Sequence, residues 1–142
     1  MSQGEERRHY PRAETSIEVR TRPLAADELP LLAGVGRPDP PVPKVERGPS
    51  PGFVRLATLN LSLGGISAEG ELELESAASY YGSGAIVVVE FDLPDGAVRA
   101  VAQVTRSGAS GGRFRLGLRF LLITDSAFMR LQDHVLRRPP RR

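Results

Sequence analysis

The residues in this sequence best suited to chemistry are arginines near its beginning. Arg7, Arg8 and Arg12 stand close together in the segment RRHYPR. A guanidinium group is planar and always charged, and it makes paired hydrogen bonds to phosphate oxygens. The net charge of the whole chain is only +2, so a broad attraction for a long polyanion is not expected. The clustering therefore predicts a local site for a small anion.

A second segment, NLSLGG at residues 60–65, could supply an opposing wall. The small hydroxyl of Ser62 can bond to backbone or to a ligand. Gly64 and Gly65 permit positive φ angles and a close approach of the backbone. Asn60 and Ser62 also begin turns well. An ordinary strand–turn–strand connection is therefore also an open explanation of this segment.

Together the two segments resemble the signature motifs of the PilZ family, RxxxR and [D/N]xSxxG. Arg8 and Arg12 fit the first motif, whereas Asn60, Ser62 and Gly65 fit the second. The motifs also occur in the family's order. Either motif alone is weak, because RxxxR occurs by chance in many basic proteins. The two in order, in a chain rich in strand signals, form a more specific pattern.

The resemblance implies a receptor for the second messenger cyclic di-GMP, with no further cofactor. Arg8 and Arg12 would clamp the ligand from a flexible arm, since arginine also pairs with the O6 and N7 edge of guanine and stacks on bases. In the family, an arginine in the place of Arg7 tends to accompany a stacked pair of ligands. Residues 60–65 would form the other wall. There Asn60 offers the guanine N–H donors one carbonyl oxygen, where aspartate offers two oxygens.

The sequence pattern predicts about six antiparallel strands and one C-terminal helix. The strands are expected at 15–22, 53–59, 66–74, 85–92, 97–106 and 113–120, with a turn over 107–112. The helix begins near a cap at Thr124 or Asp125 and carries Phe128, Leu131 and Val135 on one face. Short strands joined by glycine and proline turns indicate an all-β protein, a closed PilZ-like barrel with the helix over one end.

The chain is expected to divide into an arm, one domain and a tail. Residues 1–14 form a flexible polar arm, 15–136 the barrel and helix, and 137–142 a basic tail. Eight of the twelve prolines fall within 23–51, which predicts a mostly irregular insertion loop with room for one helical turn at 25–32. The PilZ resemblance covers the chain on either side of this insertion.

Several function classes lack support in the sequence. No apolar stretch approaches the roughly 20 residues of a membrane helix, and the polar N-terminus lacks a signal-peptide core. We therefore expect a cytoplasmic protein without membrane insertion. There is no cysteine, and His9 and His134 belong to no metal-spaced cluster. With no nucleophile elbow, P-loop or dinucleotide fingerprint, neither catalysis nor a metal site is expected.

Two other functions stay open. A PilZ-like adaptor that acts through protein contacts without nucleotide is compatible with Asn60 and with the long insertion. A barrel that binds single-stranded nucleic acid would need aromatic residues among basic ones, and the aromatic content is only 6%, so nucleic acid is not an expected partner.

Three further residues have simple structural explanations. We expect Tyr80 and Tyr81 to be loop or core residues and not to stack on a base. Arg119 could reach a ligand, although a solvated strand face explains it more simply. The downstream protein partner is not encoded in any recognisable motif.

Overall fold

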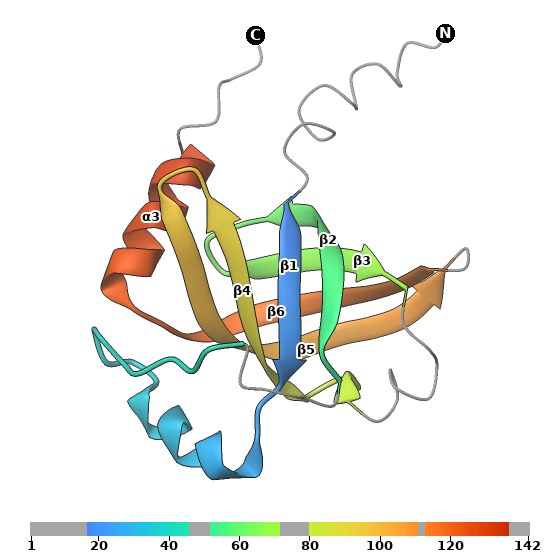
Figure 1. Ribbon diagram of the computed structural model, residues 1–142, viewed down its shortest axis with the longest axis horizontal. Helices are drawn as coiled ribbons and strands as arrows, with labels where there is room; N and C mark the ends of the chain where they lie inside the picture. The colour runs from blue at the N-terminus through green and yellow to red at the C-terminus, as the bar shows by residue number, and fades with distance from the viewer. Residues whose placement is uncertain (1–16, 46–51, 72–79, 111–112, 137–142) are drawn as a thin grey trace, which may run out of the picture.

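Six antiparallel strands close into a barrel, and a helix follows the last strand (Figure 1). The computed structural model describes residues 17–45, 52–71, 80–110 and 113–136. Its elements are β1 (Glu18–Pro23), the 3-10 helix η1 (Ala26–Gly34), β2 (Val54–Leu61), β3 (Gly65–Gly70), β4 (Ile86–Leu93), β5 (Gly96–Ser110), β6 (Arg113–Ile123) and α3 (Asp125–Leu136). Around the barrel the strand order is β1-β2-β3-β6-β5-β4. The predicted all-β fold, a six-stranded antiparallel barrel with a C-terminal helix, is confirmed.

Strand β1 closes the barrel because it is paired along both of its edges. Glu18 lies opposite Ala57 of β2, and Arg20 lies opposite Glu90 of β4. Val19, between them in sequence, faces the interior and is fully buried. With both neighbours hydrogen-bonded to β1, no strand of the barrel has a free edge.

The long apolar run of β4 is buried on both faces, as its composition predicts. Val87 and Val89 belong to the interior core, whereas Val88 points outward and is also fully buried. Val88 lies in a row that crosses four strands, next to Arg22 of β1 and Val101 of β5, and Val101 in turn lies opposite Leu122 of β6. All the members of this outer row are buried. Another part of the chain must therefore cover the outside of the barrel here.

Residues 23–45 provide that cover. Gly34 lies so close to Leu122 that a Cβ added to it would stand 3.7 Å from Leu122 Cδ2. Further along, the Pro38 carbonyl accepts a hydrogen bond of 3.0 Å from the Asp125 amide, and Val45 is fully buried. The prediction of a mostly irregular loop with one helical turn was too cautious. Its N-terminal part folds into η1, and the segment that follows packs on the barrel.

A buried arginine fixes this cover to the barrel. Arg22 is only 1% exposed, and its guanidinium makes a two-pronged contact with the Glu28 carboxylate at 2.7 and 2.9 Å. The same guanidinium donates to the carbonyls of Pro23, Lys44 and Val45. Glu28 also accepts a hydrogen bond from the Ala25 amide at the start of η1. The Arg22 guanidinium therefore holds both ends of residues 23–45, and each of its three nitrogens has a hydrogen-bond acceptor.

Helix α3 adds its apolar face to the same core. Thr124 caps it, since the Ala127 amide donates to the Thr124 hydroxyl at 3.2 Å. Ala127 and Leu131 are buried, and Val135 packs against the cluster. Phe128 is only half-buried. Leu131 and Val135 of the predicted face thus pack on the core, whereas Ala127 and not Phe128 occupies the innermost position of the first turn.

The β5–β6 hairpin is longer than predicted. The expected turn over 107–112 is strand as far as Ser110, with Gly108 opposite Arg115 and Ser110 opposite Arg113. Residues 111–112 lie outside the described part of the chain. In this part of the strand, a Cβ at Gly108 would meet nothing within 4 Å, and Ser107 and Ala109 are exposed. Its glycine and serine content therefore resembles a turn although its backbone is paired.

Tyr81 is a core residue, in agreement with the expectation that it would be a loop or core residue and not stack on a base. It is fully buried, and its hydroxyl shares a hydrogen bond of 2.9 Å with Thr21 and donates to the Gly52 carbonyl. Burial raises the pKa of Tyr81 to about 12, and the bond to Thr21 acts in the opposite sense. The hydroxyl thus joins β1 to the residue that precedes β2, while the ring fills the interior.

The buried ion pair gives the first testable expectation. Glu28→Gln leaves the Arg22 charge buried without its counter-charge, and we expect it to lower the free energy of unfolding by about 3 kcal/mol. Glu18→Gln is the matched control, because Glu18 is 52% exposed and pairs with Arg20 and Arg55 only at 3.6 and 3.5 Å. That change should cost less than about 0.5 kcal/mol. Urea unfolding of both variants measures the difference, and equal stabilities would contradict the role given to Arg22.

Candidate functional site

The second sequence motif forms the tight connection between β2 and β3. The Ser62 amide donates to the Gly65 carbonyl at 3.0 Å. The Ser62 hydroxyl accepts from the amides of Gly64 and Gly65, both at 3.3 Å, and lies 3.3 Å from the Gly65 carbonyl. Ser62 and Gly64 are exposed. The serine therefore shapes its own turn, as an ordinary strand–turn–strand connection requires, and its side chain lies at the surface.

Gly65 is a glycine because a neighbouring strand lies against it. A Cβ added there would stand 2.0 Å from the Leu118 carbonyl oxygen of β6, far inside contact distance. The Gly64 carbonyl accepts a hydrogen bond of 2.9 Å from the Phe120 amide. Neither Gly64 nor Gly65 has a positive φ, so that part of the sequence argument was wrong. The requirement is the close approach of β6, which presses the turn onto the barrel wall.

Asn60 stands on the outside of the barrel beside a β-bulge. The pairing of β2 with β3 shifts between Thr58 and Asn60, which leaves Leu59 without a partner residue and places Asn60 opposite Ser67. Asn60 is exposed, and its side-chain amide has no hydrogen-bond partner among the described residues. The amide is therefore available to a ligand from solvent.

The start of β1 lies next to this turn. The Ile17 carbonyl accepts hydrogen bonds from the Thr58 amide at 2.9 Å and from the Thr58 hydroxyl at 2.7 Å. The chain that precedes Ile17 thus leaves the barrel two residues along β2 from Asn60. Arg7, Arg8 and Arg12 lie outside the described residues. A fully extended chain spans at most about 3.3–3.6 Å per residue, so Arg12 is attached within about 18 Å of Ile17.

Two arginines outside the motifs face outward near the same turn, and the sequence analysis considered only Arg119. Arg119 of β6 lies opposite Gly65, and Arg106 of β5 lies opposite Gly117. Both are exposed. Alternation along β6 already indicated that Arg119 faces out. Arg106 could not be placed from the sequence, because a bulge between Val104 and Arg106 decides which way it points.

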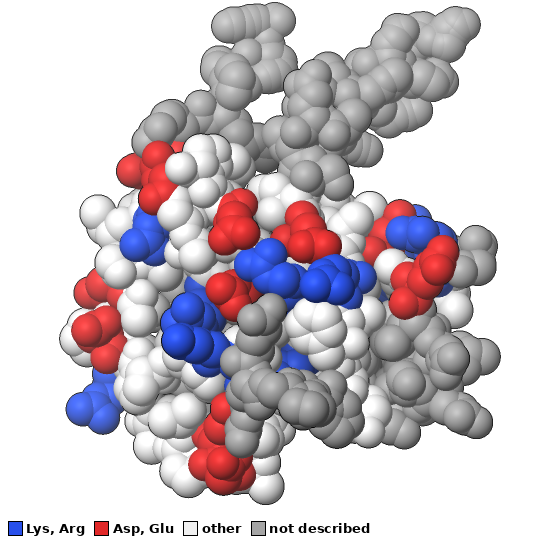
Figure 2. All heavy atoms as spheres, in the orientation of Figure 1, with Lys and Arg blue, Asp and Glu red and all other residues white. Residues whose placement is uncertain are grey.

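The face of the barrel over β1 is charge-compensated and is a poor anion site. Arg20 lies within 4 Å of three carboxylates, those of Glu18, Glu90 and Asp92, and Arg55 lies 3.5 Å from Glu18. Figure 2 shows basic and acidic side chains mixed across this face. Surface pairs of this kind contribute little to stability, but they cancel the field that would attract a phosphate.

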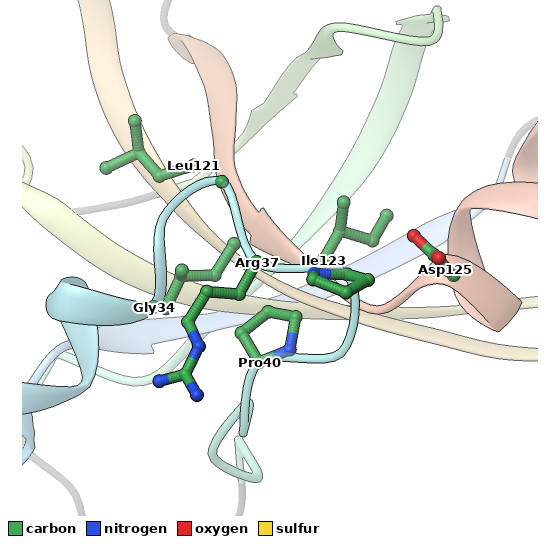
Figure 3. A pocket seen from close by; sticks show the side chains of 9 residues that line it. Gly34, Arg37, Pro40, Leu121, Ile123 and Asp125 are labelled. Atoms are coloured by element: carbon green, nitrogen blue, oxygen red, sulfur yellow. The ribbon is translucent and has the colours of Figure 1, made fainter.

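A hollow of about 300 Å³ between residues 34–40 and the end of β6 is also a poor candidate. Its walls are mostly glycine, proline and the aliphatic side chains of Leu121 and Ile123. The two charged residues, Arg37 and Asp125, do not converge in it, and Figure 3 shows the Arg37 guanidinium extending away from Asp125. A specific polar site needs convergent polar groups.

Among the described residues, no three histidine, cysteine, aspartate or glutamate side chains group closely enough to hold a metal ion. Within those residues, neither helix has the length and apolar character required to cross a bilayer.

Comparison with known proteins identifies the fold. No protein-family model and no curated protein matches the sequence. The structure of Bacillus subtilis inhibitor of motility (MotI/DgrA) is similar over 87% of this chain, with a TM-score of 0.58 and 16% sequence identity. The PilZ domain of CeSA from a cellulose-synthesizing bacterium is similar over 86% of this chain and 91% of its own, with a TM-score of 0.50 and 15% identity. The chain spans 47% of the length of MotI/DgrA. Its fold is therefore PilZ-like, as the resemblance of the motifs implied.

The two glycines of the turn provide a matched test of its geometry. Gly65→Ala forces a Cβ against the Leu118 carbonyl, so β3 and β6 must move apart, and we expect a loss of about 2–3 kcal/mol in unfolding free energy. Gly64→Ala meets nothing within 4 Å and should change the stability by less than about 0.5 kcal/mol. Thermal unfolding of the two variants measures the contrast. A Gly65→Ala protein as stable as Gly64→Ala would contradict the close approach described above.

Proposed function

We propose that this protein is a receptor for cyclic di-GMP that acts by binding and not by catalysis. One observation carries the proposal. The strand that follows the RxxxR motif begins beside Thr58, two residues from the first residue of the NxSxxG motif. Because Arg12 precedes Ile17 by only five positions, this geometry on a PilZ-like barrel supports a site shared by the two motifs, although Arg12 and Asn60 are 48 positions apart.

The ligand's chemistry fits the two walls. Each phosphate of a cyclic dinucleotide can accept paired hydrogen bonds from Arg8 or Arg12, and each guanine offers a face for guanidinium stacking. On the barrel, the exposed Asn60 amide can accept from a guanine N–H group, and the Ser62 hydroxyl can bond to the ligand. Gly64, exposed and without a side chain, lets the ligand approach the backbone.

The proposed response is closure of the arm. Binding would order residues 1–14 against the β2–β3 turn and so present a new surface to a downstream protein. With Arg7 directly before the motif, the arm has a third guanidinium for a stacked pair of ligands. The receptor would act in the cytoplasm of a bacterium, on motility, exopolysaccharide production or biofilm formation. Cyclic di-GMP carries the signal, and no other cofactor is needed.

A second candidate is an adaptor with a PilZ-like fold that signals through protein contacts alone. Two observations favour it. Asn60 offers a single acceptor oxygen to the guanine edge. Residues 23–45 form an ordered outer layer whose Leu29 and Val35 are 50% and 53% exposed, which is an apolar surface that a protein could cover. MotI/DgrA, which has a similar fold, is named as an inhibitor of motility.

Calorimetric titration of cyclic di-GMP into the full chain decides between the two. A receptor binds in the micromolar range or tighter, and the stoichiometry distinguishes one ligand from a stacked pair. Arg8→Ala with Arg12→Ala should weaken binding by at least about 100-fold, because each lost guanidinium contact to phosphate or guanine is worth about 1–3 kcal/mol.

The control is Arg37→Ala. It removes an exposed arginine in residues 23–45, outside the proposed site, and should leave the affinity for cyclic di-GMP unchanged. An absence of binding by the unaltered protein at millimolar ligand would contradict the receptor and favour the adaptor. Equal binding by the double variant would contradict the role of the arm.

A further inference from the structure

The outer face of the barrel continues beyond the β2–β3 turn as three rows of residues. Each row crosses β3, β6 and β5 in register. The row nearest the turn joins Gly65, Arg119 and Gln103; the next joins Ser67, Gly117 and Arg106; the third joins Glu69, Arg115 and Gly108. The buried Leu116 and Leu118 alternate with the outward residues of β6. The first two rows therefore form one surface with the turn.

The charges of these rows are unequal. Arg115 in the third row is 3.2 Å from the Glu69 carboxylate and is neutralised. Arg119 donates at 2.8 Å to the side-chain oxygen of Gln103, which carries no charge. Arg106 has no acidic partner among the described residues. The two rows beside the turn thus hold two uncompensated guanidinium groups, in contrast to the paired arginines over β1.

The surface between the two arginines carries only small residues. Gly117 has no side chain, and Ser67 beside it is small. The Arg106 side chain lies across Gly117, since its Nε would be 3.3 Å from a Cβ placed there. Arg106 is held outward by the bulge at Thr105, whose hydroxyl donates to the Gly117 carbonyl at 3.1 Å. Arg119 and Arg106 are diagonal neighbours on the adjacent strands β6 and β5, about 7–8 Å apart between Cα atoms. At this spacing one phosphate can bridge the two guanidinium groups.

We propose that Arg119 and Arg106 are ligand-binding residues that extend the site from the β2–β3 turn across β6 to β5. They hold a phosphate or a guanine edge of the cyclic dinucleotide on the outer face of β6 and β5. Gln103 positions Arg119 by accepting one of its N–H groups. This inference rests on the proposed function, because it takes its occupant from there. It adds a binding surface made of described residues on two neighbouring strands.

Calorimetric titration of the full chain with cyclic di-GMP tests the proposal. We expect Arg119→Gln and Arg106→Gln each to weaken binding about 10-fold, and the double variant about 100-fold. Arg119→Lys keeps the charge but loses the planar fork and should recover only part of the affinity. Arg55→Gln is the control, since it makes the same change at a 60% exposed arginine over the compensated face and should alter the affinity less than about twofold.

The outcomes separate this inference from the proposed function. Loss of affinity in the Arg106 and Arg119 variants with unchanged thermal unfolding supports it. Full affinity in the double variant, with binding abolished by the Arg8→Ala, Arg12→Ala change, overturns this inference and leaves the receptor intact. No binding by the unaltered protein overturns both.

Discussion

Strand β1 is hydrogen-bonded to β2 on one edge and to β4 on the other, and most other features of the molecule depend on this double pairing. It closes the barrel, so that the interior side chains of the six strands share one core. It also fixes where the two flanking segments leave the barrel. The N-terminal arm departs beside Thr58 and hence beside the β2–β3 turn. The opposite end of β1 carries Arg22, which anchors residues 23–45.

The polar groups at the two ends of β1 are in different environments. At the Arg22 end, a charge has been removed from water, and its ion pair with Glu28 and its carbonyl partners compensate for the lost solvation. That part of the molecule is fixed, and it covers the outer row formed by Val88, Val101 and Leu122. At the turn, the polar groups of Asn60 and Ser62 remain exposed, and the adjacent arginines have no carboxylate partner among the described residues. A charged ligand can bind polar groups of this kind without first breaking an internal ion pair, and its own charge can offset the hydration that they lose.

Much of the fold was predictable from local patterns. The alternation of Phe114, Leu116 and Leu118 with arginines predicted β6, and the unbroken apolar run of β4 predicted burial on both faces. The strand content of residues 107–110 was missed, because paired backbone in an exposed hairpin needs no particular side chain. The order within 23–45 was missed as well. It depends on Arg22 meeting Glu28 and two distant carbonyls, and a single arginine in a strand does not indicate such a contact.

The candidate site, like the fold, was only partly predictable from the sequence. The motif spacing identified Asn60, Ser62, Gly64 and Gly65, but the reason for glycine at 65 is a contact with β6, which only the assembled barrel reveals. Arg119 was visible as an outward residue. Its pairing with Gly65 and the placement of Arg106 depend on strand register and on a bulge, neither of which a sequence pattern specifies.

Nuclear magnetic resonance of the isotope-labelled protein, titrated with cyclic di-GMP, tests most directly whether the arm and the barrel wall form one binding site. The expected result is a set of saturable shifts in the backbone amides of residues 7–10 and 12, of the turn from Ser62 to Ile66, and of Arg119 and Phe120. The amides that line the hollow near Arg37 and Asp125 should stay unchanged. Shifts confined to that hollow, or no shifts at millimolar ligand, would contradict the site and the receptor function built on it.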